Sequence, residues 1–228
     1  MSDFSLQISQ MGENSILIEW PQSIDESILE DVIFFKNLVL ESQNNRLVNH
    51  TPAYASILLQ YFHRIDFEEL KNELLVLYKT INTDLITVPK EWHIPVCYHS
   101  SLALDLDSFK SKNISHKELI QLHTGRSYRV YMIGFLPGFF YLGGLPVRLH
   151  LSRKSTPNLK TPKGAIAIGG QQTGIYPMES PGGWHVIGQT PLSLFDIDSE
   201  NPTPIGQGDY IKFYEINLET YRILKSEG

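Results

Sequence analysis

Residues 131–196 read YMIGFLPGFFYLGGLPVRLHLSRKSTPNLKTPKGAIAIGGQQTGIYPMESPGGWHVIGQTPLSLFD, and this stretch largely determines the fold. Glycine and proline recur throughout it, yet large side chains such as Phe139, Tyr176 and Trp184 stand between them. A flexible linker would lack such side chains. The stretch therefore predicts short strands and tight turns whose backbones approach each other, or a ligand, closely. Many short strands joined in this way indicate a β-barrel or a β-sandwich.

Tight turns separate the predicted strands of this stretch. A strand over 128–133 leads into Pro137-Gly138, which is a strong signal for a type II turn. A strand of small residues over 165–168 ends at Gly169-Gly170. Strand-like alternation returns at 192–195 and 210–214.

Residues 1–88 predict a small α+β layer with helices on one face of a sheet. Ser23 with Glu26, and Asp66 with Glu69, have the spacing of capping boxes at the starts of two helices. The expected order is strand, strand, helix, strand, helix, over the ranges 4–8, 16–20, 23–39, 54–62 and 66–81.

The polar segment 82–91 predicts a domain boundary. We therefore expect a small α/β domain over 1–88 and a β-rich domain over 89–228. The second domain begins with a strand over 92–98, where Pro95 indicates an edge strand or a bulge because proline cannot donate to the ladder. Ser115 with Glu118 predicts the start of a further helix.

The composition restricts the class of protein. The 228 residues carry a net charge of −6 without a prominent basic stretch, which argues against nucleic acid as the main partner. Cys97 is the only cysteine, so neither an internal disulfide nor a cysteine zinc site is expected, and Asp105 and Asp107 lack companions for a metal site. No signal peptide and no apolar run of about 20 residues is evident. We expect a cytoplasmic protein without a membrane segment or metal site.

Candidate chemistry is limited to polar groups near the glycine turns. Arg153, Lys154, Lys160 and Lys163 could together hold a carboxylate or a phosphate, or they could be solvated loop residues; the sequence favours neither interpretation. His123 falls in the last turn of a predicted helix, where a cation is favoured by the helix dipole, so a structural role is favoured over catalysis. The glycine clusters match no nucleotide-binding pattern, and no catalytic triad can be assembled, so the catalytic residues are unknown.

The segments GFLPGFFYLGGLP, TPKGAIAIGGQQTGIYP and SPGGWHVIGQTPLSLFD, with IPVCY before them, resemble the allophanate hydrolase subunit 1 family. This family includes the B subunit of prokaryotic 5-oxoprolinase (PxpB) and the Kip inhibitor (KipI) of a sporulation histidine kinase. The resemblance covers nearly the whole chain. It implies an α+β fold with an N-terminal ferredoxin-like domain and a C-terminal cyclophilin-like β-barrel.

The resemblance also implies a function. A member of this kind is a non-autonomous subunit of an ATP-dependent hydrolase that opens 5-oxo-L-proline to L-glutamate. The implied partners are a subunit 2 homologue (PxpC-like) and a LamB/YcsF-type protein (PxpA-like), and ATP is used at the level of the complex. The alternative is a binding protein that inhibits a histidine kinase through a surface around Phe139, Phe140 and Trp184. Prolyl isomerisation is disfavoured, because a fold does not imply a function and no cyclophilin active-site pattern is present.

The matching motifs and the nearby cations define a candidate surface for substrate or partner binding. Arg153 or Lys163 would hold a carboxylate, and the side chains of Gln172 and Thr173 would bond an amide. The full candidate set is Phe135, Pro137, Gly138, Tyr141, His150, Arg153, Lys163, Gly169, Gly170, Gln172, Thr173, Gly182, Gly183 and Trp184.

Two segments depart from the family pattern. The family's PRxxVPAG reads PNLKTPKG here, so Asn158 stands where arginine is usual and Lys163 where alanine is usual. The glycine-rich segment usual after IPVCY is replaced by residues 99–103. These departures bear on the substrate more than on the fold.

Overall fold

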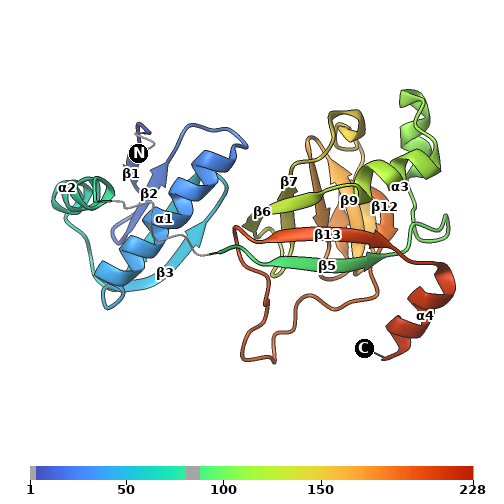
Figure 1. Ribbon diagram of the computed structural model, residues 1–228. Coiled ribbons are helices and arrows are strands. Elements are labelled where there is room, and N and C mark those ends of the chain that lie inside the picture. The colour runs from blue at the N-terminus through green and yellow to red at the C-terminus, as the bar shows by residue number, and fades with distance from the viewer. Residues whose placement is uncertain (1–3, 81–87, 228) are drawn as a thin grey trace. The chain divides into compact units, whose positions relative to one another are not determined.

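The computed structural model describes residues 4–80 and 88–227, and the chain divides into two compact units, Met1–Val88 and Pro89–Gly228 (Figure 1). Residues 82–87 of the predicted boundary segment lie outside the described residues. Within the described ranges, no helix combines the length and apolar character needed to cross a membrane.

The first unit is a four-stranded antiparallel sheet in the order β1-β2-β4-β3, with two helices packed on one face. Alternate residues of β2 and β4, such as Ile18 and Leu59, pack against Val32 and Phe35 of α1 and Leu70 of α2. The elements are β1 (Gln7–Gln10), β2 (Ser15–Glu19), α1 (Glu26–Gln43), β3 (Leu47–Pro52), β4 (Ser56–Tyr61) and α2 (Phe67–Tyr78).

Two predictions for this unit were wrong. The strand β3 was missed, because half of LVNHTP is polar and Leu47 alone is buried, so the segment lacks the apolar alternation of a half-buried strand. Helix α1 is capped by Asp25 instead of Ser23: the Asp25 carboxylate accepts from the backbone nitrogens of Ser27 and Ile28. Asp66 does cap α2, as predicted, by accepting from the Glu69 backbone nitrogen at 3.1 Å.

The second unit is built on a seven-stranded mixed sheet in the order β12-β9-β10-β7-β6-β13-β5, beside a two-stranded sheet of β8 and β11. Its strands are β5 (Glu91–Val96), β6 (Ser127–Ile133), β7 (Phe140–Gly143), β8 (Asn158–Thr161), β9 (Ala165–Gly169), β10 (Gln172–Ile175), β11 (Ser180–Gly182), β12 (His185–Gln189) and β13 (Tyr210–Glu215). Its helices are η1 (Leu106–Lys112), α3 (His116–Thr124), η2 (Val147–Leu149) and α4 (Leu218–Glu227).

The large sheet curls so that its two terminal strands meet at one point. Cys97, directly after β5, exchanges two backbone hydrogen bonds with Gln189 of β12, at 2.9 and 3.0 Å. β5 is a terminal strand of the sheet and pairs in parallel with β13 alone, which confirms Pro95 on an edge strand. The chain is therefore a mixed α+β protein with a curled, partly closed sheet, whereas the finer ferredoxin-like and cyclophilin-like assignments stay predictions.

The predicted strand over 192–195 is absent. Local hydrogen bonds organise this segment instead: Leu192 donates its backbone nitrogen to the Thr190 hydroxyl, and the Ser193 hydroxyl donates to the Phe195 carbonyl. Such side-chain-to-backbone bonds compete with sheet pairing. The Phe195 side chain packs against the turn at Gly138, where a Cβ atom would come within 2.6 Å of it.

Candidate functional site

The large sheet of the second unit has two chemically different faces. Val130, Leu142, Ile166 and Ile168 alternate toward the main hydrophobic core of the unit. On the opposite face, three strands carry glycine where a side chain would point outward, and aromatic rings cover them. We call this surface the glycine face: Gly143, Gly169 and Gly174, with the rings of Tyr131, Phe139, Tyr141 and Trp184.

The glycines are required by the rings that lie on them. A Cβ atom on Gly169 would come within 2.5 Å of the Trp184 indole, and one on Gly174 within 2.9 Å of it. The distance between a side-chain carbon and a ring normally exceeds about 3.4 Å, so only bare backbone admits the indole here. Trp184 is consequently 5% exposed although it lies outside the main hydrophobic core.

Phe139 is the centre of this aromatic cluster. Its ring centroid lies 4.7 Å from that of Tyr141, 4.9 Å from Tyr176 and 5.5 Å from Trp184, all edge-on. Edge-to-face pairs of this kind add to the stabilisation from burial alone. The rings therefore form a rigid platform.

A strained turn lies at the rim of the platform. Phe139 donates its backbone nitrogen to the Leu136 carbonyl at 3.0 Å, with Pro137 and Gly138 between them and Gly138 at φ +79°, which confirms the predicted type II turn. Phe135 precedes it with φ +72° and a side chain that is 63% exposed. A bulky residue in the left-handed region is an outlier, and such strain concentrates at functional sites.

Polar groups border the platform. The Arg153 guanidinium lies 5.6 Å from the Trp184 ring centroid, a cation–π distance, and the residue is exposed. Gln172 pairs with Gly169 across the sheet, so its side chain points to the same face. It is 7% exposed, and its Nε2 is buried without a hydrogen-bond partner among the residues that the structure describes.

The four predicted cations do not form one group. Lys154 is nearly buried and binds Asp105 at 2.5 Å and Asn158 at 3.1 Å, while Lys160 is exposed, 3.7 Å from Glu179. Lys163 is exposed and belongs to the turn that precedes Ala165 at the start of β9, whereas Gly169 and Trp184 lie at the other end of that strand. The cation beside the platform is therefore Arg153.

Thr173 belongs to the core instead of the glycine face. Its hydroxyl donates to the Ala167 carbonyl at 3.1 Å and meets Nε2 of His123 at 3.0 Å. Nδ1 of His123 lies 2.7 Å from the Tyr98 hydroxyl. This network makes Nε2 the donor and Nδ1 the acceptor of a neutral imidazole.

His123 is therefore not the helix-end cation that the sequence predicts. The imidazole is fully buried and stacks on Phe213 with 4.7 Å between the ring centroids. Burial without a counter-charge lowers the pKa of His123 from 6.5 to about 3. The group stays neutral at ordinary pH and is enclosed, which leaves it unsuited to exchange protons with a substrate.

The depressed pKa of His123 predicts a pH-dependent stability. Below about pH 6.5 His123 is protonated in the unfolded chain but stays neutral in the folded chain. The free energy of unfolding therefore falls as the pH drops. Between pH 8 and pH 5, His123 is expected to lower the free energy of unfolding by about 2 kcal/mol. Urea unfolding of the wild type and of His123→Gln at both pH values should show this loss only in the wild type. Equal losses in both proteins would contradict a buried, neutral His123. The pKa of His50 is lowered too, but its effect on stability is the same in both proteins and cancels in the comparison.

The remaining candidates shape the backbone beside the glycine face. His150 binds the Leu145 carbonyl through Nε2 at 2.9 Å, and Gly170 exchanges two backbone hydrogen bonds with Leu151. Gly182 packs on the Tyr176 hydroxyl, and the Gly183 carbonyl accepts from the Lys154 backbone nitrogen at 2.8 Å. Their roles in binding stay predictions.

The sequence reasoning missed Arg129 and Tyr131 of β6. Arg129 pairs with Gly143 across the sheet, is 6% exposed, and stacks on Tyr210 at 4.6 Å. The Tyr131 ring covers Gly143. The alternation in SYRVYMI, with Tyr128 and Val130 on the core face, would have placed both residues on the opposite face.

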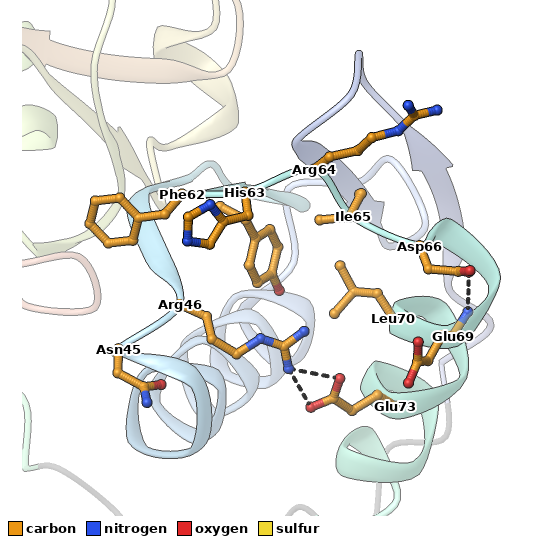
Figure 2. Close-up of a pocket in the computed structure, with 11 residues that line it drawn as sticks. Asn45, Arg46, Phe62, His63, Arg64, Ile65, Asp66, Glu69, Leu70 and Glu73 are labelled. Atoms are coloured by element: carbon orange, nitrogen blue, oxygen red, sulfur yellow. Dashed lines mark hydrogen bonds and ion pairs between the residues drawn. The ribbon is translucent and has the colours of Figure 1, made fainter.

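The first unit contains a pocket of ≈ 490 Å³ between the end of β4 and α2 (Figure 2). Arg46 donates to both carboxylate oxygens of Glu73 at 3.0 Å, and its guanidinium lies 5.7 Å from the Tyr61 ring centroid. The Tyr61 hydroxyl in turn donates to Gln43, which donates to Glu73. These polar groups bind one another and link α1, β4 and α2, so they are explained by a structural role. Within 4–80 and 88–227, no cluster of three or more His, Cys, Asp or Glu side chains suited to a metal ion is found.

Comparison with known proteins places the chain in a family. Residues 6–205 match the family described as carboxyltransferase domain, subdomain C and D. A protein of Bacillus subtilis, named as the B subunit of 5-oxoprolinase, is 33% identical over 97% of this chain and 98% of that protein. The protein of the same name from Haemophilus influenzae is 42% identical, over 68% of this chain and 73% of its own length. The chain belongs to the carboxyltransferase subdomain C and D family and, within it, to the group of 5-oxoprolinase B subunits.

A solved structure agrees with this membership. The protein TTHA0988 has 30% identity and a TM-score of 0.77 over 89% of this chain, which spans 40% of that longer chain. These comparisons support an enzyme-complex subunit and give no support to the kinase-inhibitor alternative.

Proposed function

We propose that this chain is a subunit of an ATP-dependent 5-oxoprolinase, which hydrolyses the ring amide of 5-oxo-L-proline to give L-glutamate. The observation that carries the proposal is the near end-to-end similarity to the Bacillus subtilis protein, at 33% identity over 97% of the chain. A cytoplasmic location is part of the proposal, because such an enzyme draws on cytoplasmic ATP.

The chain is proposed to act only with partners, a subunit 2 homologue and a LamB/YcsF-type protein. Two features of the described residues support this. His123 is fully buried in the core of the second unit, so its imidazole is not accessible to a substrate on the glycine face. The exposed, strained Phe135 offers an aromatic contact that folding of the isolated chain does not require.

We assign ATP to the partner subunits. The glycines of the glycine face are occupied by rings, and neither glycine cluster matches a phosphate-binding loop. The role proposed for this chain is to complete the binding site for the cyclic amide and to orient it, so that partner groups and activated water reach its carbonyl carbon.

A leave-one-out reconstitution tests the proposal. The three proteins are co-expressed and purified, and glutamate release from 5-oxoproline is measured with and without ATP. The complete set should release glutamate only with ATP, and omission of this chain should abolish the release. Absence of activity from the complete, stably assembled set would refute the proposal, as would full activity without this chain.

A further inference from the structure

Arg153 is the charged group best placed to meet a ligand on the glycine face. Its guanidinium lies 5.6 Å from the Trp184 ring centroid, and the other side of the indole is closed by Gly169. No ion pair or hydrogen bond of the Arg153 side chain is present among the described residues. A guanidinium in a cation–π contact still has N–H groups available, and these can bind a carboxylate in a bidentate manner.

The backbone that carries Arg153 is anchored on both sides. Leu151 exchanges hydrogen bonds with Gly170 at 3.0 and 2.7 Å, and the Ser152 carbonyl accepts from Nε2 of His185 at 2.9 Å. After Arg153, the Lys154 backbone nitrogen donates to Gly183 at 2.8 Å. An arginine on a loop held in this way loses little conformational freedom when a ligand binds.

The side chain of Lys154 strengthens this anchor. It binds Asp105, whose second carboxylate oxygen accepts from the Val186 backbone nitrogen at 2.8 Å. The ion pair is 14% and 16% exposed and ties the loop to the start of β12, directly after Trp184. Lys154 therefore helps to fix the position of Arg153, and its own ammonium group is already bound to Asp105.

Gln172 supplies a second recognition group. Its side chain shares the face of Gly169 and Gly174, both of which contact the indole of Trp184. An Nε2 donor that is buried without a partner carries a desolvation cost that a ligand carbonyl would offset. A guanidinium and an amide donor on one face together suit a small molecule with a carboxylate and an amide carbonyl.

We propose that Arg153 binds the carboxylate of the substrate and thereby selects acidic cyclic amides over neutral ones, with Gln172 directed at the amide carbonyl. The inference rests on the proposed function and chooses between the two cations that the sequence offers for this task. Lys163 is excluded from it, because it lies at the opposite end of β9 from the Trp184 platform.

Equilibrium dialysis of the assembled three-protein complex, without ATP, tests the inference. The two ligands are 5-oxoproline and 2-pyrrolidone, which has the same ring without the carboxylate. Arg153→Met should weaken binding of 5-oxoproline about tenfold or more and leave 2-pyrrolidone binding unchanged. Lys160→Met, a matched loss of an exposed cation on the neighbouring β8, should leave both affinities as in the wild type.

Three results would overturn the assignment: an unchanged preference for 5-oxoproline in Arg153→Met, equal weakening of both ligands, or loss of the preference in Lys163→Met instead. A wild-type complex that prefers 5-oxoproline but never hydrolyses it would refute the proposed function and leave the Arg153 assignment standing. Arg153 is exposed, so the variant is expected to fold, which thermal unfolding checks.

Discussion

Replacement of Lys154 by methionine is expected to lower the free energy of unfolding by about 3 kcal/mol, because it leaves the nearly buried Asp105 carboxylate without its counter-charge. In the wild type, Lys154 lies 2.5 Å from Asp105 and 3.1 Å from Asn158, and the Asp105 side chain is 16% exposed. The Val186 backbone nitrogen, the other donor to Asp105, carries only a partial charge. Urea unfolding near neutral pH measures the loss.

Two further variants make this prediction specific. Lys160→Met removes an exposed lysine 3.7 Å from Glu179 and should change stability by less than about 0.5 kcal/mol. In the Lys154→Met background, Asp105→Asn should recover part of the loss, because the amide oxygen can still accept from Val186 and no bare charge remains. A Lys154→Met protein within about 1 kcal/mol of wild type would show that the ion pair does not anchor the loop.

Local sequence signals predicted the parts of the fold that depend on local chemistry. Asp66 and Ser115 cap their helices because a short oxygen-bearing side chain can reach a backbone nitrogen three residues on. Pro137-Gly138 forms a type II turn because proline restricts one dihedral angle and glycine accepts φ +79° at the next. Such preferences act within a few residues, so they can be predicted without the tertiary structure.

The errors occur where the tertiary structure overrides or replaces a local pattern. Leu47–Pro52 is an edge strand with polar side chains, and its identity comes from pairing with β4 instead of from its own alternation. The segment 192–195 alternates like a strand, but local hydrogen bonds and the contact of Phe195 with the Gly138 turn use its backbone and side chains. Pattern alone cannot identify a missing partner strand.

The sequence predicted which stretch of the chain carries the candidate site, but not how its side chains are arranged in space. The sequence indicated that bare backbone is approached closely here, and the Trp184 ring does lie on Gly169 and Gly174, while a binding role for these residues stays a prediction. Proximity in sequence suggested that Lys154 and Lys163 act together with Arg153. Lys154 instead pairs with Asp105, which is distant in the chain, and Lys163 lies at the opposite end of β9 from Trp184. Arg129 joins the glycine face through cross-strand pairing with Gly143, which depends on the strand order.

Phe135→Gly is expected to separate function from stability. Phe135 has φ +72° and a side chain 63% exposed, so glycine relieves backbone strain and sacrifices little burial beyond the edge contact with Phe139 at 5.7 Å. The melting temperature should stay level or rise. If the rim of the glycine face is a contact surface of the enzyme, loss of an exposed aromatic anchor should still reduce activity about 30-fold.

The decisive comparison is glutamate release by the three-protein assembly containing Phe135→Gly against the assembly containing Asn113→Gly, the matched control. Asn113 is the other non-glycine residue with positive φ among the described residues, at +54°, and it caps η1 away from the aromatic platform. We predict about 30-fold lower release with Phe135→Gly at an unchanged or higher melting temperature, and wild-type release with Asn113→Gly. Wild-type release from the Phe135→Gly assembly would contradict a functional role for the glycine face.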